Sequence, residues 1–301
     1  MWGKTVPLAL LGVAGLVLAL LLLAAACGGG KSGQVELEPG GQSTPSPAVS
    51  ETPARATPSA TPAPAPPSAT PVAASCPLQA AVEGQANLLH NAGLESGADP
   101  WCVLQPPKFE VSQNYAHSGQ ASALLSMRVP AEAVSEHEVH YLVQQVVPKE
   151  FPELVSGYYR VENWSKGTPK QYLQFAVIVC RDGSEGECTQ GAANVSGGYG
   201  YNQQMRYPLA GISEDPFKIG NAHFVYISKE EPRTGEWVYF EGNIKEDFRE
   251  LWGAVPEGYD YIRVLFEVRF DDKQAGGAAA EADVYYDDLY MGSASGNPNR
   301  P

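Results

Sequence analysis

The sequence predicts an all-β fold, an antiparallel β-sandwich, for residues 76–301. Several segments alternate apolar and polar residues with period two and are rich in β-branched and aromatic residues, which is typical of half-buried strands. Turn-forming residues separate these segments. No stretch keeps a long apolar period of 3.6 residues, so helices are not expected between the strands, and this disfavours an α/β fold.

The strands are expected in chain order at residues 139–147, 156–162, 172–179, 222–227, 237–244, 261–270 and 284–291. Between them stand turn signals that include Pro148, Asn163, Asp182-Gly183 and Pro256-Glu257-Gly258. Residues 246–252 are expected to form at most one turn of helix. Many short strands with Gly and Pro between them favour two packed sheets.

The N-terminus looks like an export signal. Lys4 is the only charge before an apolar run over residues 6–26, and a basic start followed by an apolar stretch and small residues is typical of secretion signals. The segment Leu23-Ala24-Ala25-Ala26-Cys27-Gly28 resembles the bacterial lipobox, in which the cysteine is acylated and becomes the mature N-terminus. It departs from the usual pattern at Ala24, where leucine is common.

The lipobox resemblance implies that residues 1–26 are a signal peptide and that Cys27 is the lipidation site. The alternative is an uncleaved anchor helix, because a run of about 20 apolar residues is long enough to span a bilayer. Both interpretations predict an extracytoplasmic domain held at a membrane.

Residues 27–75 consist mostly of Pro, Thr, Ser, Ala and Gly. Such a composition cannot bury enough apolar surface to offset the entropy lost on folding. Dense proline favours extended polyproline II, so the segment is expected to be a disordered, semi-rigid stalk with a reach on the order of 100 Å. Its glycosylation is left open.

Four cysteines remain after Cys27, an even number that in an exported domain favours two disulfides. Cys180 and Cys188 enclose the turn Asp182-Gly183, so they are expected to pair, which leaves Cys76 for Cys102. A zinc site is the rival use of four cysteines, but it favours short C-x-x-C spacings that the sequence lacks.

The net charge of −14 lies entirely within residues 76–301. Residues 1–75 contain three basic side chains and three acidic ones, which cancel: Lys4, Lys31 and Arg55 against Glu36, Glu38 and Glu51. An acidic domain repels the phosphate backbone, so no nucleic-acid partner is expected.

Three motifs carry a family resemblance: Asn87–Gly97 followed by Trp101, then Ser118-Gly119, and the ending Tyr286-Asp287-Asp288-Leu289. With Gly235-Glu236-Trp237 between them, they resemble the opening and closing strands of galactose-binding-like jelly-roll modules of the cellulose- and xylan-binding type. The middle, residues 181–222, is longer than in the shorter members of that family.

The resemblance implies a structural calcium ion that joins the first and last strands. Its ligands would be the carbonyls of Gly93 and Gln120 and the carboxylates of Glu95 and Asp287, a set of hard oxygens that Ca²⁺ prefers. Asp287 shares strand parity with Leu289 and Met291, so it is expected to point inward, where an unpaired carboxylate is costly. The alternative is that both carboxylates merely accept backbone hydrogen bonds.

Alternation in three strands leaves a mixture of rings, amides and charges outside the core, and this is the chemistry that a saccharide site needs. The candidate ligand-binding residues are Tyr158, Arg160, Tyr172, Gln174, Arg263 and Glu267. The alternative is an ordinary solvated sheet face with cross-strand ion pairs.

No catalytic motif stands out in the sequence. There is no G-x-S-x-G elbow and no phosphate-binding glycine loop, and His137-Glu138-Val139-His140 is one residue short of a zinc-protease motif. The sequence therefore favours a surface-tethered, non-catalytic lipoprotein that binds polysaccharide. The alternatives are a structural or adhesive lipoprotein that binds a protein and, less favoured, a polysaccharide-active enzyme with two carboxylates in a cleft.

Overall fold

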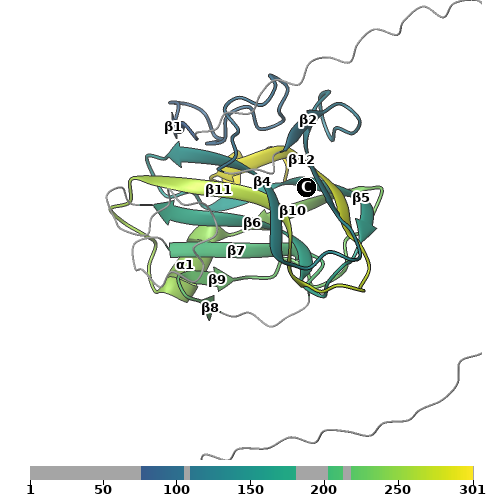
Figure 1. The fold of residues 1–301 in the computed structure, drawn as a ribbon. Coiled ribbons are helices and arrows are strands. Elements are labelled where there is room, and N and C mark those ends of the chain that lie inside the picture. Colours follow the sequence, from purple (N-terminus) through teal and green to yellow (C-terminus); the bar gives the residue numbers. More distant parts are fainter. Residues whose placement is uncertain (1–75, 105–108, 181–202, 213–217, 301) are drawn as a thin grey trace, which may run out of the picture. The chain divides into compact units, whose positions relative to one another are not determined.

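The computed structural model describes residues 76–104, 109–180, 203–212 and 218–300. In this part of the chain, two sheets pack into the expected β-sandwich (Figure 1). The seven-stranded sheet runs in the order β1 (Leu78–Ala80), β4 (Ser135–Val147), β11 (Tyr261–Lys273), β6 (Gln171–Cys180), β7 (Gln203–Ala210), β9 (Ala222–Phe224) and β8 (Lys218–Ile219). The five-stranded sheet runs in the order β10 (Trp237–Gly242), β5 (Leu154–Ser165), β12 (Ala280–Gly292), β3 (Ser122–Val129) and β2 (Glu110–Ser112).

Each predicted strand overlaps an observed one, but two are shorter than expected. The segment at 222–227 is paired only over β9, and β10 ends at Gly242 because the short helix α1 (Ile244–Trp252) begins directly after it. Ile244 and Phe248 are the buried side of α1, and Gly253 ends it in a left-handed conformation with φ of 84°. Glycine adopts that conformation without the steric cost of a side chain.

Two strand pairs are parallel, which the antiparallel prediction did not foresee. They are β1 with β4 and β7 with β9. Parallel neighbours need a crossover connection, and the chain between β1 and β4 provides one because it crosses to the other sheet to form β2 and β3.

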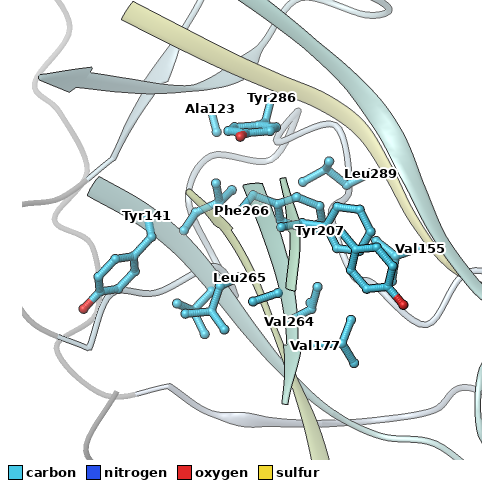
Figure 2. Packing of buried hydrophobic residues seen from close by; sticks show 14 of the residues in the cluster. Ala123, Tyr141, Val155, Val177, Tyr207, Val264, Leu265, Phe266, Tyr286 and Leu289 are labelled. Carbon is cyan, nitrogen blue, oxygen red and sulfur yellow. The ribbon is translucent and has the colours of Figure 1, made fainter. Parts of the chain in front are cut away.

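The core lies between the two sheets and is rich in aromatic rings. Phe266 of β11 contacts Phe175 in its own sheet, and it contacts Phe240 and Tyr286 from the five-stranded sheet, with centroid distances of 5.6–6.2 Å. Figure 2 shows Phe266, Tyr207 and Leu289 among the buried side chains of this core. Rings at these separations add to the burial energy of the sandwich.

The opening segment lies beside the last strand, as the family resemblance implies. Asn87 donates from Nδ2 to the Leu289 carbonyl (2.8 Å) and accepts from the Met291 amide (3.0 Å). Trp101 is almost fully buried and donates from Nε1 to the Asn91 carbonyl (2.9 Å). These bonds hold the loop over residues 87–101 against β12.

No helix in the described ranges is long and apolar enough to cross a membrane. The predicted signal peptide, Cys27 and the stalk lie outside the described residues, so their assignments stay predictions.

Candidate functional site

The four predicted calcium ligands lie at one corner of the sandwich. We call Gly93, Glu95, Gln120 and Asp287 the carboxylate corner. Glu95 accepts amide hydrogen bonds from Gln120 (3.0 Å) and Ala121 (3.1 Å). A side chain at Gly93 would lie 3.4 Å from Oδ1 of Asp287 and 3.8 Å from Cγ of Glu95. The opening and closing segments therefore place the side chains of Glu95 and Asp287 beside Gly93.

Asp287 is fully buried. Its Oδ2 accepts the amides of His117 (2.7 Å) and Ser118 (3.3 Å), and its Oδ1 accepts the amide of Asp288 (2.7 Å). Burial raises the pKa of the Asp287 carboxyl to about 6, and the charge of Asp288 adds to this, while the amide bond from His117 acts in the opposite direction.

The inward orientation predicted for Asp287 is wrong. Asp287 is opposite Tyr158 on β5, one residue after the core side chain of Tyr286, so it lies on the outer side of the sheet. Register shifts between Asp287 and Tyr290, where Asp288 has a φ of 48°, and this irregularity returns Leu289 to the core. Asp287 is buried because residues 117 and 118 lie over it.

The fit of the carboxylate corner to calcium rests on its donor set. It offers two carboxylates and two carbonyls, which are ligands that Ca²⁺ prefers. In the described part of the chain, no group of three or more His, Cys, Asp or Glu side chains is arranged to hold a metal ion. Both carboxylates also accept backbone amides, as the alternative interpretation requires. Calcium binding therefore stays a prediction.

The six predicted ligand-binding residues do not form one face. Tyr158 and Arg160 lie on β5 of the five-stranded sheet, whereas Tyr172, Gln174, Arg263 and Glu267 lie on β6 and β11 of the seven-stranded sheet. The second group points away from the core but is buried, with 0–5% of each residue exposed. The prediction of one exposed surface is therefore wrong.

The outer side of the seven-stranded sheet carries a buried polar cluster that we call the polar face. It consists of Tyr172, Gln174, Arg206, Arg263, Glu267 and Arg269. Glu267 accepts from Nε2 of Gln174 (2.5 Å) and lies 3.8 Å from Arg206 and 4.0 Å from Arg269. Leu265 lies midway between Arg263 and Glu267 on β11, and its cross-strand neighbours are Val143 on β4 and Ala176 on β6. These three side chains form an apolar row across the polar face.

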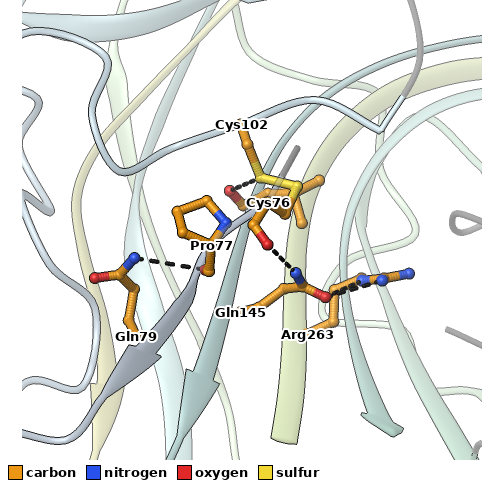
Figure 3. The surroundings of a disulfide bond; sticks show 7 residues. Cys76, Pro77, Gln79, Cys102, Gln145 and Arg263 are labelled. Atoms are coloured by element: carbon orange, nitrogen blue, oxygen red, sulfur yellow. Dashed lines mark hydrogen bonds between the residues drawn. A yellow bond between two sulfur atoms is a disulfide. The ribbon is translucent and has the colours of Figure 1, made fainter. Parts of the chain in front are cut away.

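Arg263 and Arg269 share this face but differ in their partners. Arg269 bonds Asp271 (2.5 Å). Arg263 donates to the neutral Oε1 of Gln145, at 2.9 Å from Nη2, and Gln145 in turn donates to the Cys76 carbonyl (Figure 3). Burial lowers the pKa of Arg263. Burial also lowers the pKa of Arg269, but Tyr172, Glu267 and Asp271 together raise it above its usual value.

Several buried atoms of the polar face lack a hydrogen-bond partner in the part of the chain that the structure describes. They are Oε1 of Gln174, Oε1 of Glu267, Nη1 of Arg263 and Nε of Arg269. Each such group costs about 1–3 kcal/mol. Buried polar groups are almost always satisfied in native proteins, so a cluster of exceptions needs an explanation.

A second cluster lies over the outer side of the five-stranded sheet, and we call it the aromatic face. Its accessible rings include Tyr115, His117 and Trp237. His117 stacks on Tyr158 at 3.6 Å and contacts the edge of Trp237 at 5.8 Å, while the Arg160 guanidinium lies 4.3 Å from the centre of the Tyr115 ring. Tyr158 and Arg160 thus support the accessible rings.

Sequence reasoning missed Arg206 and the accessible rings. Arg206 lies on β7, a strand that follows the long middle of the chain and was not among those predicted. Trp237 occurs in a motif that carries the family resemblance, and His117 directly precedes another, but those motifs gave no sign that loop and strand rings would meet. Apolar–polar alternation shows which side of one strand a residue lies on, but it does not show which residues of other strands or loops lie next to it.

The disulfide between Cys76 and Cys102 is confirmed. Cys180 is also disulfide-bonded. Cys188, its predicted partner, lies outside the described residues.

No family model matches the chain, and no curated protein matches it. Similar solved structures include TmCBM61 in complex with β-1,4-galactotriose, at 16% identity, covering 68% of this chain and 97% of that one, with a TM-score of 0.35. The CBM22-1 xylan-binding domain of Paenibacillus barcinonensis Xyn10C matches at 16% identity, covering 71% and 99%, with a TM-score of 0.36. A family 16 carbohydrate-binding module matches at 14% identity, covering 68% and 99%, with a TM-score of 0.34.

Proposed function

We propose that this chain is a surface-tethered, non-catalytic lipoprotein that binds polysaccharide through the polar face. The observation that carries the proposal is the group of buried, partnerless hydrogen-bonding atoms on the outer side of a sheet. Sugar hydroxyls both donate and accept hydrogen bonds, so one ligand type can satisfy the carbonyl oxygen of Gln174, the carboxylate of Glu267 and the N–H groups of Arg263 and Arg269.

The chemistry of the polar face also suits a pyranose ring. The row formed by Val143, Leu265 and Ala176 offers apolar contact to C–H groups, and the polar rows on both sides offer hydrogen bonds. Binding sites commonly combine an apolar lining with a few placed polar groups. Burial raises the pKa of Tyr172 to about 12, so its phenol stays a hydrogen-bond donor at neutral pH.

Burial of the polar face has a consequence for affinity. The side chains are inaccessible in this structure, so a glycan binds only molecules in which this face is open. The apparent Kd then equals the intrinsic Kd divided by the fraction of open molecules. This predicts weaker apparent binding than the number of available hydrogen bonds suggests.

The carboxylates of the polar face support binding without catalysis. Glycoside hydrolysis uses two carboxyl groups on either side of the scissile bond. Of the nearest carboxylates in the described residues, Glu267 is engaged by Gln174 and Asp271 by Arg269. In the proposed tethered form, Cys27 carries the lipid and the segment 27–75 holds the domain away from the membrane.

Affinity electrophoresis of the full chain tests the proposal. The gels contain soluble xylan, β-1,4-galactan, mixed-linkage β-glucan or carboxymethyl cellulose. We expect at least one glycan to retard the chain, and Glu267→Gln to weaken that binding about tenfold or more, because hydrogen bonds to charged groups contribute about 1.5–3 kcal/mol. Glu281→Gln, on the other sheet, is the matched control.

Circular dichroism confirms that both variants are folded. The proposal is overturned if none of the glycans retards the chain. If Glu267→Gln binds as tightly as the control, the polar face is not the glycan-binding site. Retention on an immobilised protein but on no glycan would instead favour the adhesive alternative.

A further inference from the structure

The aromatic face presents rings in fixed orientations at the protein surface. Tyr115 is 39% exposed and the His117 side chain is 32% exposed. Trp237 is half-buried. Its indole N–H has no hydrogen-bond acceptor among the residues that the structure describes. The five-stranded sheet thus offers several accessible rings and a free donor on the side that faces away from the core.

Each of these rings is held by specific contacts. His117 is fixed by the stacked ring of Tyr158 and by a 2.7 Å contact between its Nδ1 and Asp288. Tyr115 is packed between the guanidinium of Arg160 and the edge of Tyr285, at a centroid distance of 5.0 Å. Ordering rings before a ligand arrives lowers the entropy cost of binding. Rings that bind no ligand do not need to be ordered in this way.

The charges around the rings are locally paired. Arg160 forms an ion pair with Glu162 at 2.7 Å, and the Asp288 carboxylate is hydrogen-bonded by His117 and by the Ser118 hydroxyl. A face with paired charges and accessible rings suits a neutral ligand that offers C–H groups to the rings and a hydroxyl to the Trp237 N–H. A neutral pyranose chain has these properties, whereas an acidic one is repelled by a domain that carries the whole net charge of −14.

We infer that the aromatic face is a second saccharide-binding surface, specific for neutral glycan chains and centred on Trp237 and His117. The inference rests on the proposed function of the chain as a glycan binder. Because the aromatic face and the polar face lie on opposite sheets of the sandwich, one chain can hold two glycan chains at once.

A bridging assay tests this inference. Insoluble xylan is loaded with the full chain and washed, and capture of fluorescent soluble xylan is then measured; the glycan that gives the strongest retardation replaces xylan if it differs. The variants are Trp237→Ala for the aromatic face and Glu267→Gln for the polar face. Leu251→Ala, which alters an exposed apolar residue on α1, is the control. Light scattering establishes the oligomeric state of each variant.

We expect the wild type and Leu251→Ala to bridge. Trp237→Ala and Glu267→Gln should each lower bridging about tenfold or more while they still bind one glycan, since a central aromatic contact often contributes this much. Tyr115→Ala gives a second test if Trp237→Ala does not fold. Unchanged bridging by folded Trp237→Ala and Tyr115→Ala would overturn the inference. If the wild type binds no glycan at all, the proposed function itself fails.

Discussion

Replacing Arg263 by methionine should change the stability of the fold by no more than about 2.5 kcal/mol in either direction, while glycan binding is lost. Arg263 is 2% exposed and has no carboxylate partner in the described part of the chain. Replacing a buried charge network by apolar side chains of similar volume is often neutral or stabilises by about 1–4 kcal/mol. Loss of the bond to Gln145 costs about 1.5–3 kcal/mol. The net change is therefore expected between roughly −2 and +2.5 kcal/mol of stability.

Arg269→Met is the matched comparison, because Arg269 lies on the same face of the same strand. Its removal leaves Asp271 without its cation and leaves Glu267 with Arg206 alone, at 3.8 Å. Breaking a buried ion pair by removing one partner costs about 3–5 kcal/mol. The two arginine variants should thus differ in stability by several kcal/mol, although both remove one buried guanidinium.

Urea denaturation followed by tryptophan fluorescence measures the free energy of unfolding of both variants, and affinity electrophoresis measures binding. A stable Arg263→Met variant that no longer binds would show that Arg263 serves ligand binding and not the stability of the fold. The reasoning is refuted if Arg263→Met is destabilised as much as Arg269→Met, or if it is stable and binds every glycan as the wild type does.

Three further outcomes are expected. The pKa of Asp287 is higher in the folded state than in the unfolded chain, so the folded protein takes up a proton as pH falls from 7 to 5. In EDTA, stability should rise over this range by about 1.3 kcal/mol, out of about 3 kcal/mol reached once the pH lies below both pKa values; urea titrations of Asp287→Asn should lack the rise. If calcium binds the carboxylate corner, replacing EDTA by millimolar Ca²⁺ at pH 7 should raise the wild-type Tm by several degrees, and calorimetry should show no such shift for Asp287→Asn; an unchanged wild-type Tm contradicts the site. Replacing both Cys76 and Cys102 by alanine opens a loop with a sequence separation of 26 and should lower the free energy of unfolding by about 3–4 kcal/mol. A loss below about 1 kcal/mol in urea denaturation would show that the unfolded chain is not constrained by this bond.

The sandwich could be predicted because its signals are local. Apolar residues occupy every second position of β6 and β11 over most of their length, and inward positions such as Phe175, Val264 and Phe266 are all buried. α1 was predicted at nearly its observed place. The parallel strand pairs could not be predicted, because they depend on which sheet each strand joins rather than on the strand itself.

The candidate site was less predictable for the same reason. Alternation shows that Arg160 and Glu267 both point away from the core, but it does not show that they lie on opposite sheets. A single irregular residue, Asp288, was enough to reverse the side predicted for Asp287. Burial of the polar face arises from tertiary packing that no single strand encodes.

The disulfide at the start of the domain also determines how the protein carries mechanical load. Any pull on the chain before Cys76 passes through the covalent bond to Cys102, whose backbone pairs with Val143 of β4. The bond therefore keeps residues 77–101 from being drawn out along the direction of the pull, even if β1 separates from β4. The force enters the sheet next to Gln145 and Arg263, in the part of the molecule where the polar face begins.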